Sequence, residues 1–127
     1  MLEHITLLVR DYKKAKEFYT KALKPIGYKR TMDFPAYKAA GFKEGGHTSL
    51  WIAQKKKFAP THIAFLAKSK KQVSDFYRAA LKAGAKDHGA PGFRTEYGPD
   101  YYAAFVLDRD LNNIEACYFG ARAPRKS

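Results

Sequence analysis

Two histidines and one glutamate offer the most direct chemistry in this sequence. His4 heads the apolar run "HITLLV", and His62 heads the run "HIAFLA". Glu115 stands between Ile114 and Ala116, where an unpaired carboxylate would be costly to bury. Two imidazoles and one carboxylate form a set that binds a divalent ion and leaves positions open for water or substrate. The long separations match no local metal-binding motif, so the fold has to bring the three residues together.

The segments that carry the two histidines are copies of one another. Residues 4–24 and 62–82 align without gaps, and nine of the 21 positions are identical. In each copy, a short apolar run of strand length precedes apolar residues at helical spacing. We therefore predict strands over 4–9 and 62–67, each followed by an amphipathic helix.

Both predicted helices have start and stop signals. Asp11 is placed to cap the first helix, while Ser69 with Gln72 three residues later forms a capping box for the second. Gly27 and Gly84 stand a few residues beyond the helix ends, where a left-handed turn is needed.

After each helix the chain has three extended segments. Their predicted ranges are 28–34, 37–42 and 48–54 in the first half, and 85–88, 101–107 and 113–119 in the second. The pattern is β-α-β-β-β written twice, which predicts an α+β fold of two tandem modules. We assign a single domain over 1–127, made of module 1 (1–57), module 2 (58–121) and a short basic tail (122–127).

Strand alternation predicts where the three polar side chains point. His4 should share a face with Thr6 and Leu8, opposite to its bulkier neighbours Ile5, Leu7 and Val9. The second copy and the last strand, which carries Glu115, repeat this alternation. The bulky apolar set should cover the helices, and the face that bears the histidines should line a cavity.

Composition narrows the class of protein. Apolar residues make up 46% of the chain, which predicts a folded globule, and Cys117 is the only cysteine, so one chain cannot build a disulfide or a thiolate zinc site. No apolar run has the length of a membrane span or of a signal peptide, so we expect a cytoplasmic protein with no membrane partner.

The net charge of +12 is large for 127 residues and comes mostly from scattered lysines. Such charge can attract anionic ligands, although much of it is usually a solvated surface. No motif of a nucleic-acid reader module is present, so we do not expect a nucleic-acid partner.

The paired strands, the helical segments "FYTKAL" and "FYRAAL", and above all "YYAAFVLDRDLNNIEACY" resemble the vicinal oxygen chelate superfamily. This superfamily includes glyoxalase I, bleomycin-resistance proteins, fosfomycin-resistance proteins and extradiol dioxygenases. The resemblance covers nearly the whole chain. It implies a cupped mixed sheet around a divalent metal ion (Zn, Ni, Mn or Fe) held by His4, His62 and Glu115, and it implies a homodimer.

Two positions depart from the pattern of that superfamily. Ser49 falls opposite Glu115 in the repeat, where glyoxalase-type members have a fourth ligand; a three-ligand site is therefore favoured. His47 lies on the same face and is either a substitute ligand with a catalytic role beside Glu115 or a surface histidine. The turn at 108–112 has Leu111 where related sequences have glycine, and we expect Asn112 to take the left-handed conformation instead.

Aromatic side chains are candidates for binding an organic substrate beside the metal. Trp51, Tyr97, Tyr101 and Tyr102, together with Ser49, are placed to line the cup. Ordinary sheet packing is the alternative explanation for the aromatic residues.

Three functions fit these observations. The first is a metal-dependent enzyme in which the ion acts as a Lewis acid on a small, oxygen-chelating substrate, and the basic charge favours an anionic one. Lyase or isomerase chemistry, thiol transfer and dioxygenation all remain open within it. The second is a non-catalytic small-molecule binding or resistance protein of the same fold. The third, a structural or nucleic-acid-binding role, has the least support.

Overall fold

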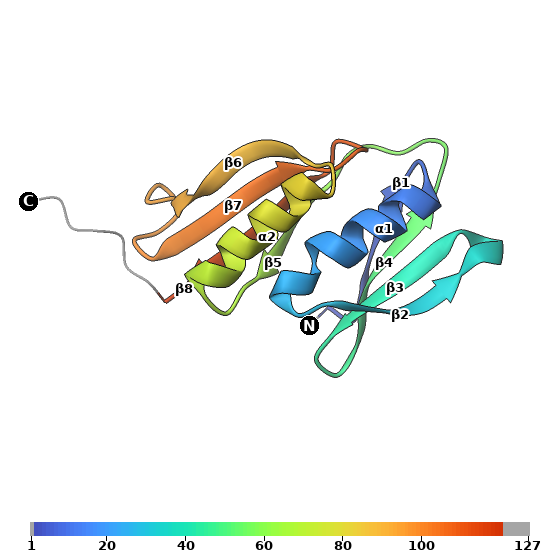
Figure 1. Ribbon diagram of the computed structural model, residues 1–127, viewed down its shortest axis with the longest axis horizontal. Helices are drawn as coiled ribbons and strands as arrows, with labels where there is room; N and C mark the ends of the chain where they lie inside the picture. The colour runs from blue at the N-terminus through green and yellow to red at the C-terminus, as the bar shows by residue number, and fades with distance from the viewer. Residues whose placement is uncertain (1, 121–127) are drawn as a thin grey trace, which may run out of the picture.

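Two similar halves build the protein, each with one helix packed on one four-stranded sheet (Figure 1). The structure is a computed structural model, and it describes residues 2–120, so the predicted basic tail lies outside the described residues. The first half contains β1 (Ile5–Val9), α1 (Tyr12–Ala22), the short 3-10 helix η1 (Lys24–Ile26), β2 (Lys29–Phe34), the 3-10 helix η2 (Pro35–Tyr37), β3 (Ala39–Glu44) and β4 (His47–Gln54). The second half contains β5 (His62–Leu66), α2 (Lys70–Lys82), β6 (Lys86–Phe93), β7 (Tyr101–Leu107) and β8 (Asn113–Phe119).

The two sheets have the same topology. Their strand orders are β1-β4-β3-β2 and β5-β8-β7-β6. The first strand of each half pairs in parallel with the last, and the remaining pairs are antiparallel. The predicted α+β class and the doubled β-α-β-β-β pattern are confirmed. One difference is the length of β6, which continues to Phe93 where we predicted a strand of only four residues.

Both helices begin at the predicted caps. The Asp11 side chain accepts a hydrogen bond from the Lys14 backbone N–H, and the Ser69 hydroxyl accepts one from the Gln72 backbone N–H. The Gln72 side chain in turn accepts from the backbone N–H of Lys68, one residue before the cap. These contacts satisfy N–H groups that the first turn of a helix leaves without partners.

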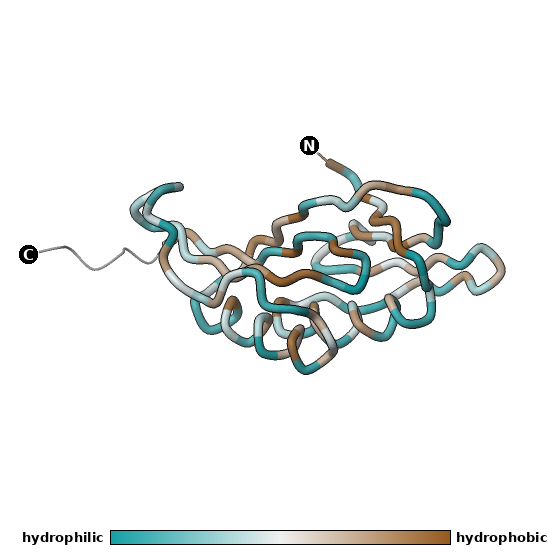
Figure 2. Tube along the Cα trace, turned by 90° about the horizontal axis from the view of Figure 1, so that it is seen from above, coloured by the Kyte–Doolittle hydropathy of each residue, from teal (hydrophilic) through white to brown (hydrophobic). Residues whose placement is uncertain are grey.

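A single core lies between the helices and the two sheets. In Figure 2 both helices lie on one side of the sheets, and Figure 1 shows them side by side and running in opposite directions. The core is built from the apolar face of each helix and from the strand residues that face it, and its largest fully buried side chains include Tyr19, Phe42, Phe76, Leu7 and Ile114. No helix among residues 2–120 is long and apolar enough to cross a membrane.

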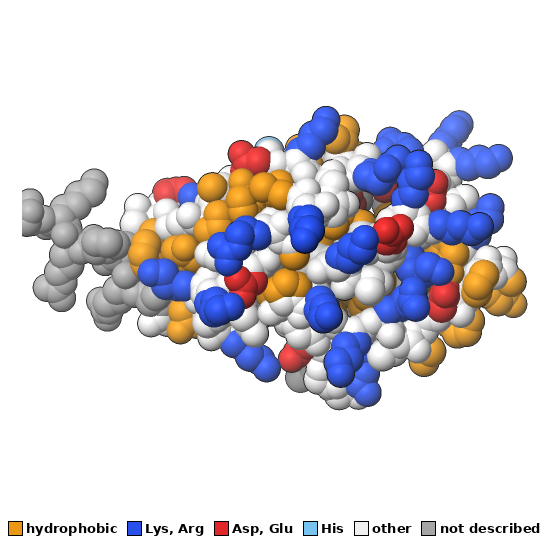
Figure 3. Space-filling view, viewed as in Figure 1, with side chains coloured by type: hydrophobic (Ala, Val, Ile, Leu, Met, Phe, Trp, Pro, Cys, Tyr) orange, Lys and Arg blue, Asp and Glu red, His pale blue; other side chains and the backbone are white. Residues whose placement is uncertain are grey.

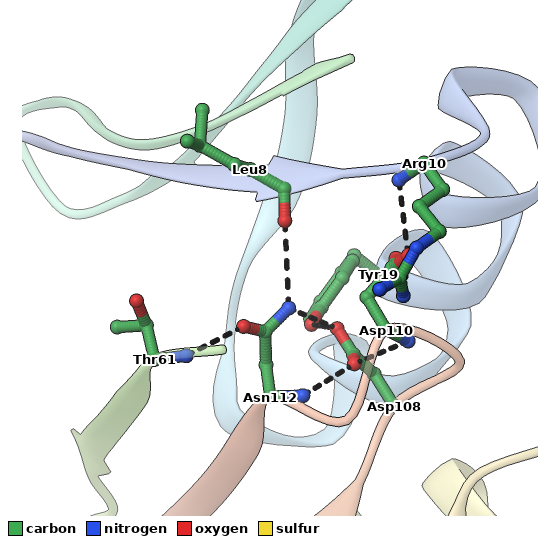
Figure 4. Close-up of polar contacts among 7 residues, drawn as sticks. All are labelled: Leu8, Arg10, Tyr19, Thr61, Asp108, Asp110 and Asn112. Carbon is green, nitrogen blue, oxygen red and sulfur yellow. Dashed lines mark hydrogen bonds and ion pairs between the residues drawn. The ribbon is translucent and has the colours of Figure 1, made fainter. Parts of the chain in front are cut away.

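The turn before β8 fastens the two halves together (Figure 4). The Asn112 side chain accepts a hydrogen bond from the backbone N–H of Thr61 at 2.8 Å, just before β5, and its amide reaches the Leu8 carbonyl in β1 at 3.5 Å. Asp110 accepts from the backbone and the guanidinium of Arg10 at 3.0 and 3.2 Å. The end of β1 is therefore held close to the start of β5.

Asp108 is the buried centre of this turn. Its carboxylate accepts from the Tyr19 phenol at 2.5 Å and from the Asn112 side chain at 2.9 Å. The same carboxylate accepts from the backbone N–H groups of Asp110 and Asn112 at 2.8 and 2.9 Å. Burial and the Asp108 carboxylate together raise the pKa of Tyr19 well above its usual value, so this phenol stays a hydrogen-bond donor.

The residue with the left-handed backbone in this turn is Leu111, with φ of 66°. We expected Asn112 to take this conformation, and that expectation is wrong because the Asn112 side chain is committed to bridging the two halves. Leu111 is 54% exposed, so no packing compensates for the unfavourable backbone.

Leu111→Gly should stabilise the protein. Removing the β-carbon relieves about 1–2 kcal/mol of strain from the left-handed backbone. Part of this gain is lost because glycine gives the unfolded chain more conformational freedom. We expect a net gain of about 0.5–1 kcal/mol in the free energy of unfolding, measured by chemical denaturation. Leu111→Ala keeps the β-carbon and is the matched control; an equal gain in both variants would contradict the strain explanation.

Asp108→Ala should destabilise the protein far more than Tyr19→Phe. The first change leaves several buried donors without an acceptor, at about 1–3 kcal/mol for each donor that water cannot reach. The second removes a single hydrogen bond and should cost about 1 kcal/mol. Urea denaturation of the two variants measures the difference, and similar losses would show that the turn does not depend on this carboxylate.

Candidate functional site

The predicted site residues of module 2 lie on the face of the sheet away from α2. On β5, Ile63 and Phe65 are buried toward the helices, whereas His62, Ala64 and Leu66 are exposed on the other face. Strand alternation therefore placed His62 on the correct face. We call the surface formed by the two sheets on the side away from the helices the open face.

Glu115 and His62 form a hydrogen-bonded pair on this open face. β5 and β8 run parallel, and Ala64 pairs with Glu115. His62 is two residues before Ala64 on the same face, so it is a diagonal neighbour of Glu115. His62 Nε2 lies 2.9 Å from Glu115 Oε1. Glu115 is only 2% exposed, while the His62 side chain is 52% exposed. A buried carboxylate thus lies beneath an accessible imidazole.

The second oxygen of Glu115 is bound by a tyrosine on β7. The Tyr101 phenol donates a hydrogen bond to Glu115 Oε2. Burial, and next the Glu115 carboxylate, raise the pKa of Tyr101 well above its usual value, so the phenol remains protonated and remains a donor. From the sequence, we considered Tyr101 only as an aromatic side chain. Strand alternation places Tyr101 on the same face as Ala103, which is the face that carries Glu115 on β8, and this alternation was the signal that could have identified it.

His4 lies at the other end from His62 of the boundary along which the two halves meet. We call this boundary the junction. It lines a crevice with Phe65 and Leu66, at the end of β5, whereas His62 is the first residue of that strand. Its Nδ1 lies 2.5 Å from Glu3 Oε1. Since the start of β5 is tied to the end of β1, the two strands run in opposite directions, which puts their leading histidines toward opposite ends of the junction in one chain.

His47 and Ser49 belong to the end of the junction where His4 lies. His47 Nε2 is hydrogen-bonded to the Glu3 carbonyl at 2.7 Å, and Ser49 lines the same crevice as His4. One chain therefore does not bring His47 next to Glu115, where a catalytic role or an extra ligand was expected.

A single chain supplies only part of the predicted metal site. Within residues 2–120, no group of three or more His, Cys, Asp or Glu side chains is arranged to hold a metal ion. His62 and Glu115 have the donor chemistry that a divalent ion needs, and they already lie in contact. The three-ligand site of His4, His62 and Glu115 therefore stays a prediction, and within residues 2–120 of one chain His4 does not join the other two residues.

The aromatic candidates divide between the two faces of the sheets. Trp51, on the open face of β4, stacks on Phe34 of β2 with ring centres 6.0 Å apart. Tyr97 is exposed and packs edge-on to Tyr101 at 5.5 Å. Tyr102 packs on the α2 side, where the Lys70 ammonium lies 5.0 Å from its ring centre. We therefore remove Tyr102 from the candidate substrate residues, since the sheet separates it from Glu115.

Much of the positive charge lies on the face away from this site. The residues of α1, η1 and α2 include nine Lys or Arg and two Asp or Glu, and Figure 3 shows many basic side chains over the helices. On the sheet that carries the site, the Arg94 guanidinium lies 5.4 Å from the ring centre of Phe105. Phe105 also lies 6.3 Å from the His62 ring, so this ring is a neighbour of both the Arg94 guanidinium and the His62 imidazole.

The duplicated β-α-β-β-β fold agrees with the superfamily to which this chain belongs. The chain belongs to the Glyoxalase/Bleomycin resistance protein/Dioxygenase superfamily, whose family model matches residues 1–116. That superfamily includes enzymes such as glyoxalases and FosX.

Solved structures agree with this membership. A glyoxalase/bleomycin resistance protein from Albidiferax ferrireducens T118 is 25% identical, with a TM-score of 0.80 over 93% of this chain and 98% of its own. The fosfomycin resistance protein FosX from Listeria monocytogenes is 20% identical, with a TM-score of 0.72 over 94% of this chain and 93% of its own. FosX from Mesorhizobium loti is 19% identical, with a TM-score of 0.69 over 94% and 92%. The two FosX structures support the fold alone. A search of curated protein sequences gave no significant match.

Cys117 follows Glu115 on the same face of β8 and is buried. Burial, and next the Glu115 carboxylate, raise the pKa of the Cys117 thiol, which disfavours the reactive thiolate. The thiol therefore has the surroundings of a structural cysteine rather than those of a nucleophile.

The Cys117 thiol should react slowly with a disulfide reagent such as DTNB at pH 8, compared with the chain unfolded in guanidinium. Glu115→Gln removes a negative charge, so it should lower the pKa of the thiol and speed the reaction in the folded protein. Cys117→Ser gives the blank, because the chain has no other cysteine. A slower reaction in Glu115→Gln than in the wild type would contradict the proposed effect of the carboxylate.

Proposed function

We propose that this protein is a metal-dependent small-molecule enzyme of the superfamily, with a divalent ion held by His62 and Glu115 of one chain and His4 of a second copy. The observation that carries the proposal is the buried Glu115 carboxylate beneath the accessible His62 imidazole. Such a pair offers two adjacent ligand atoms on an open surface, where a third donor can approach.

A second copy is needed because of the approximate twofold relation between the modules. His4 offers the same kind of imidazole ligand as His62, but it lies at the far end of the junction. If two chains meet open face to open face, the His4 end of each one can approach the His62 end of the other. This is the arrangement that the proposed homodimer provides.

The open face also has the composition of a surface that another chain covers. Large apolar side chains are exposed on β5, β8 and β2 and in the segment after β2, namely Leu66 (70%), Phe119 (49%), Met32 (43%), Phe34 (44%) and Tyr37 (81%). Exposed apolar groups of this kind favour association with a protein partner.

The ion would supply Lewis acidity toward two oxygens of a substrate. The chain's own residues would surround that substrate: Arg94 offers a cation at the ring of Phe105, a neighbour of His62, which favours an anionic substrate, and Trp51 offers an aromatic surface. Lyase or isomerase chemistry, thiol transfer and dioxygenation are all compatible with such a site.

The second candidate is a non-catalytic small-molecule binding or resistance protein. It is favoured by one observation: both oxygens of Glu115 already have hydrogen-bond partners, in His62 and Tyr101. The buried carboxylate is therefore stabilised within the chain, and the fold does not need an ion to compensate its charge. Metal uptake separates the two candidates.

The two candidates predict different results when inactive variants are mixed. His4→Ala and Glu115→Ala, each alone, should lose stoichiometric binding of Zn, Ni, Mn or Fe. A heterodimer of the two variants keeps one complete site, built from His4 of the Glu115→Ala chain and from His62 and Glu115 of the His4→Ala chain. Mixing the two variants with subunit exchange should therefore restore binding to about a quarter of the wild-type level, because random pairing makes half of the dimers mixed.

Metal analysis after gel filtration measures this recovery. His88→Ala changes an exposed histidine outside the site and should leave metal uptake unchanged. If the wild type binds metal but the mixture recovers none, the cross-chain site is wrong. If the wild type cannot be loaded with any of the four metals, the enzyme proposal fails and the binding protein remains.

A further inference from the structure

The side chains of Tyr101 and Glu115 are in contact although their backbone positions are far apart along the sheet. β7 and β8 pair so that Tyr101 is opposite Phe119, Ala103 is opposite Cys117, and Phe105 is opposite Glu115. Tyr101 is thus four residues along the strand from the partner position of Glu115, which corresponds to about 14 Å between backbone positions. The two side chains can touch only if both lean along the sheet toward each other.

Small residues between them leave room for this contact. Ala103 and Cys117 lie on the open face, yet they are 0% and 6% exposed. The contact from the Tyr101 phenol to Glu115 spans these two positions, since Tyr101 donates to Glu115 Oε2 from four residues along the strand. Larger side chains at these two positions would occupy the space that the ring needs.

Neighbouring rings hold Tyr101 in this orientation. Phe119 packs edge-on against it, with ring centres 4.9 Å apart and an angle of 88° between the planes. Tyr97 packs against it at 5.5 Å and 66°. Edge-to-face pairs of this kind stabilise the arrangement beyond the effect of the area that they bury. The phenol is therefore fixed before any ligand arrives.

We infer that Tyr101 is a positioning residue that holds Glu115 in one orientation, so that only Oε1 is presented beside His62. The inference rests on the metal site proposed above. With Oε2 bound by the phenol, Glu115 would act as a ligand through a single oxygen. The carboxylate would not have to be ordered when an ion binds, because the hydrogen bond has already ordered it.

Tyr101→Phe tests this role, because it keeps the ring and removes only the hydroxyl. Tyr97→Phe is the matched control, since it removes a hydroxyl from the adjacent ring of the same cluster. Both variants are compared with the wild type by titration with Co²⁺ alone at one pH, with thermal unfolding to show that the fold is kept. Tyr101→Phe should bind Co²⁺ about 10 to 100-fold more weakly, as is typical when a group that orients a metal ligand is removed.

The visible spectrum of bound Co²⁺ gives a readout other than affinity. Without the phenol, both oxygens of Glu115 can reach the ion, so the positions and intensities of the bands should change. They should stay unchanged in Tyr97→Phe. Equal affinity and equal spectra in Tyr101→Phe and in the wild type would overturn the inference, and so would tighter binding in Tyr101→Phe.

A measurement without metal separates this inference from the proposed function. The ¹⁵N NMR signals of the His62 side chain report its hydrogen bond to Glu115 in the metal-free protein. They should shift in Tyr101→Phe but not in Tyr97→Phe. If the wild type takes up no Co²⁺, the proposed metal site fails. The His62 signals then decide the role of Tyr101, because an unchanged signal in Tyr101→Phe overturns it.

Discussion

The hydrogen bonds of the 108–112 turn are the constraint on which the arrangement of the site depends. Asp108 organises this turn from within, and Asn112 links the end of β1 to the start of β5. The two leading strands therefore run in opposite directions. Consequently His4 and His62, which are equivalent in sequence, lie at opposite ends of the junction, and one chain places only His62 beside Glu115.

The sheets lie between the positively charged helices and the residues of the candidate site. The helices carry much of the positive charge on one face, whereas the buried carboxylate and its partners lie on the other. The large net charge of the sequence is thus a poor guide to the ligand of the site. Arg94 is a better guide, because its guanidinium lies on Phe105, which is also a neighbour of His62.

The sequence alone was sufficient to predict what depends on local physics. Strand alternation placed His62 and Glu115 on one face, helical spacing placed the core, and Asp11 and Ser69 marked the helix starts. The repeat could not predict how the two copies meet, because that depends on contacts between residues about 100 positions apart, such as Arg10 and Asp110. The sequence therefore left open whether His4 would meet His62 within one chain.

Two finer errors have the same physical origin. Tyr101 and Tyr102 are adjacent and chemically alike, and only the pairing register of β7 shows that Tyr101 faces Glu115 while Tyr102 faces α2. In the turn, composition favoured Asn112 for the left-handed position, but the tertiary role of its side chain excluded it and left that backbone to Leu111. A propensity is a local quantity, and each of these positions is decided by a partner elsewhere in the chain.

The duplication is exact for the histidines and broken for the carboxylate, and this break determines how many carboxylate ligands each site between two chains would have. Module 1 has Trp51, and not the expected Ser49, at the position equivalent to Glu115, because Ala64 pairs with Glu115 whereas its counterpart Thr6 pairs with Trp51. The end of the junction with His4 therefore lacks a carboxylate at that position. Two chains related by a twofold axis would pair each His4 end with one His62 end. They would thereby form two identical sites, each with two imidazoles and a single carboxylate.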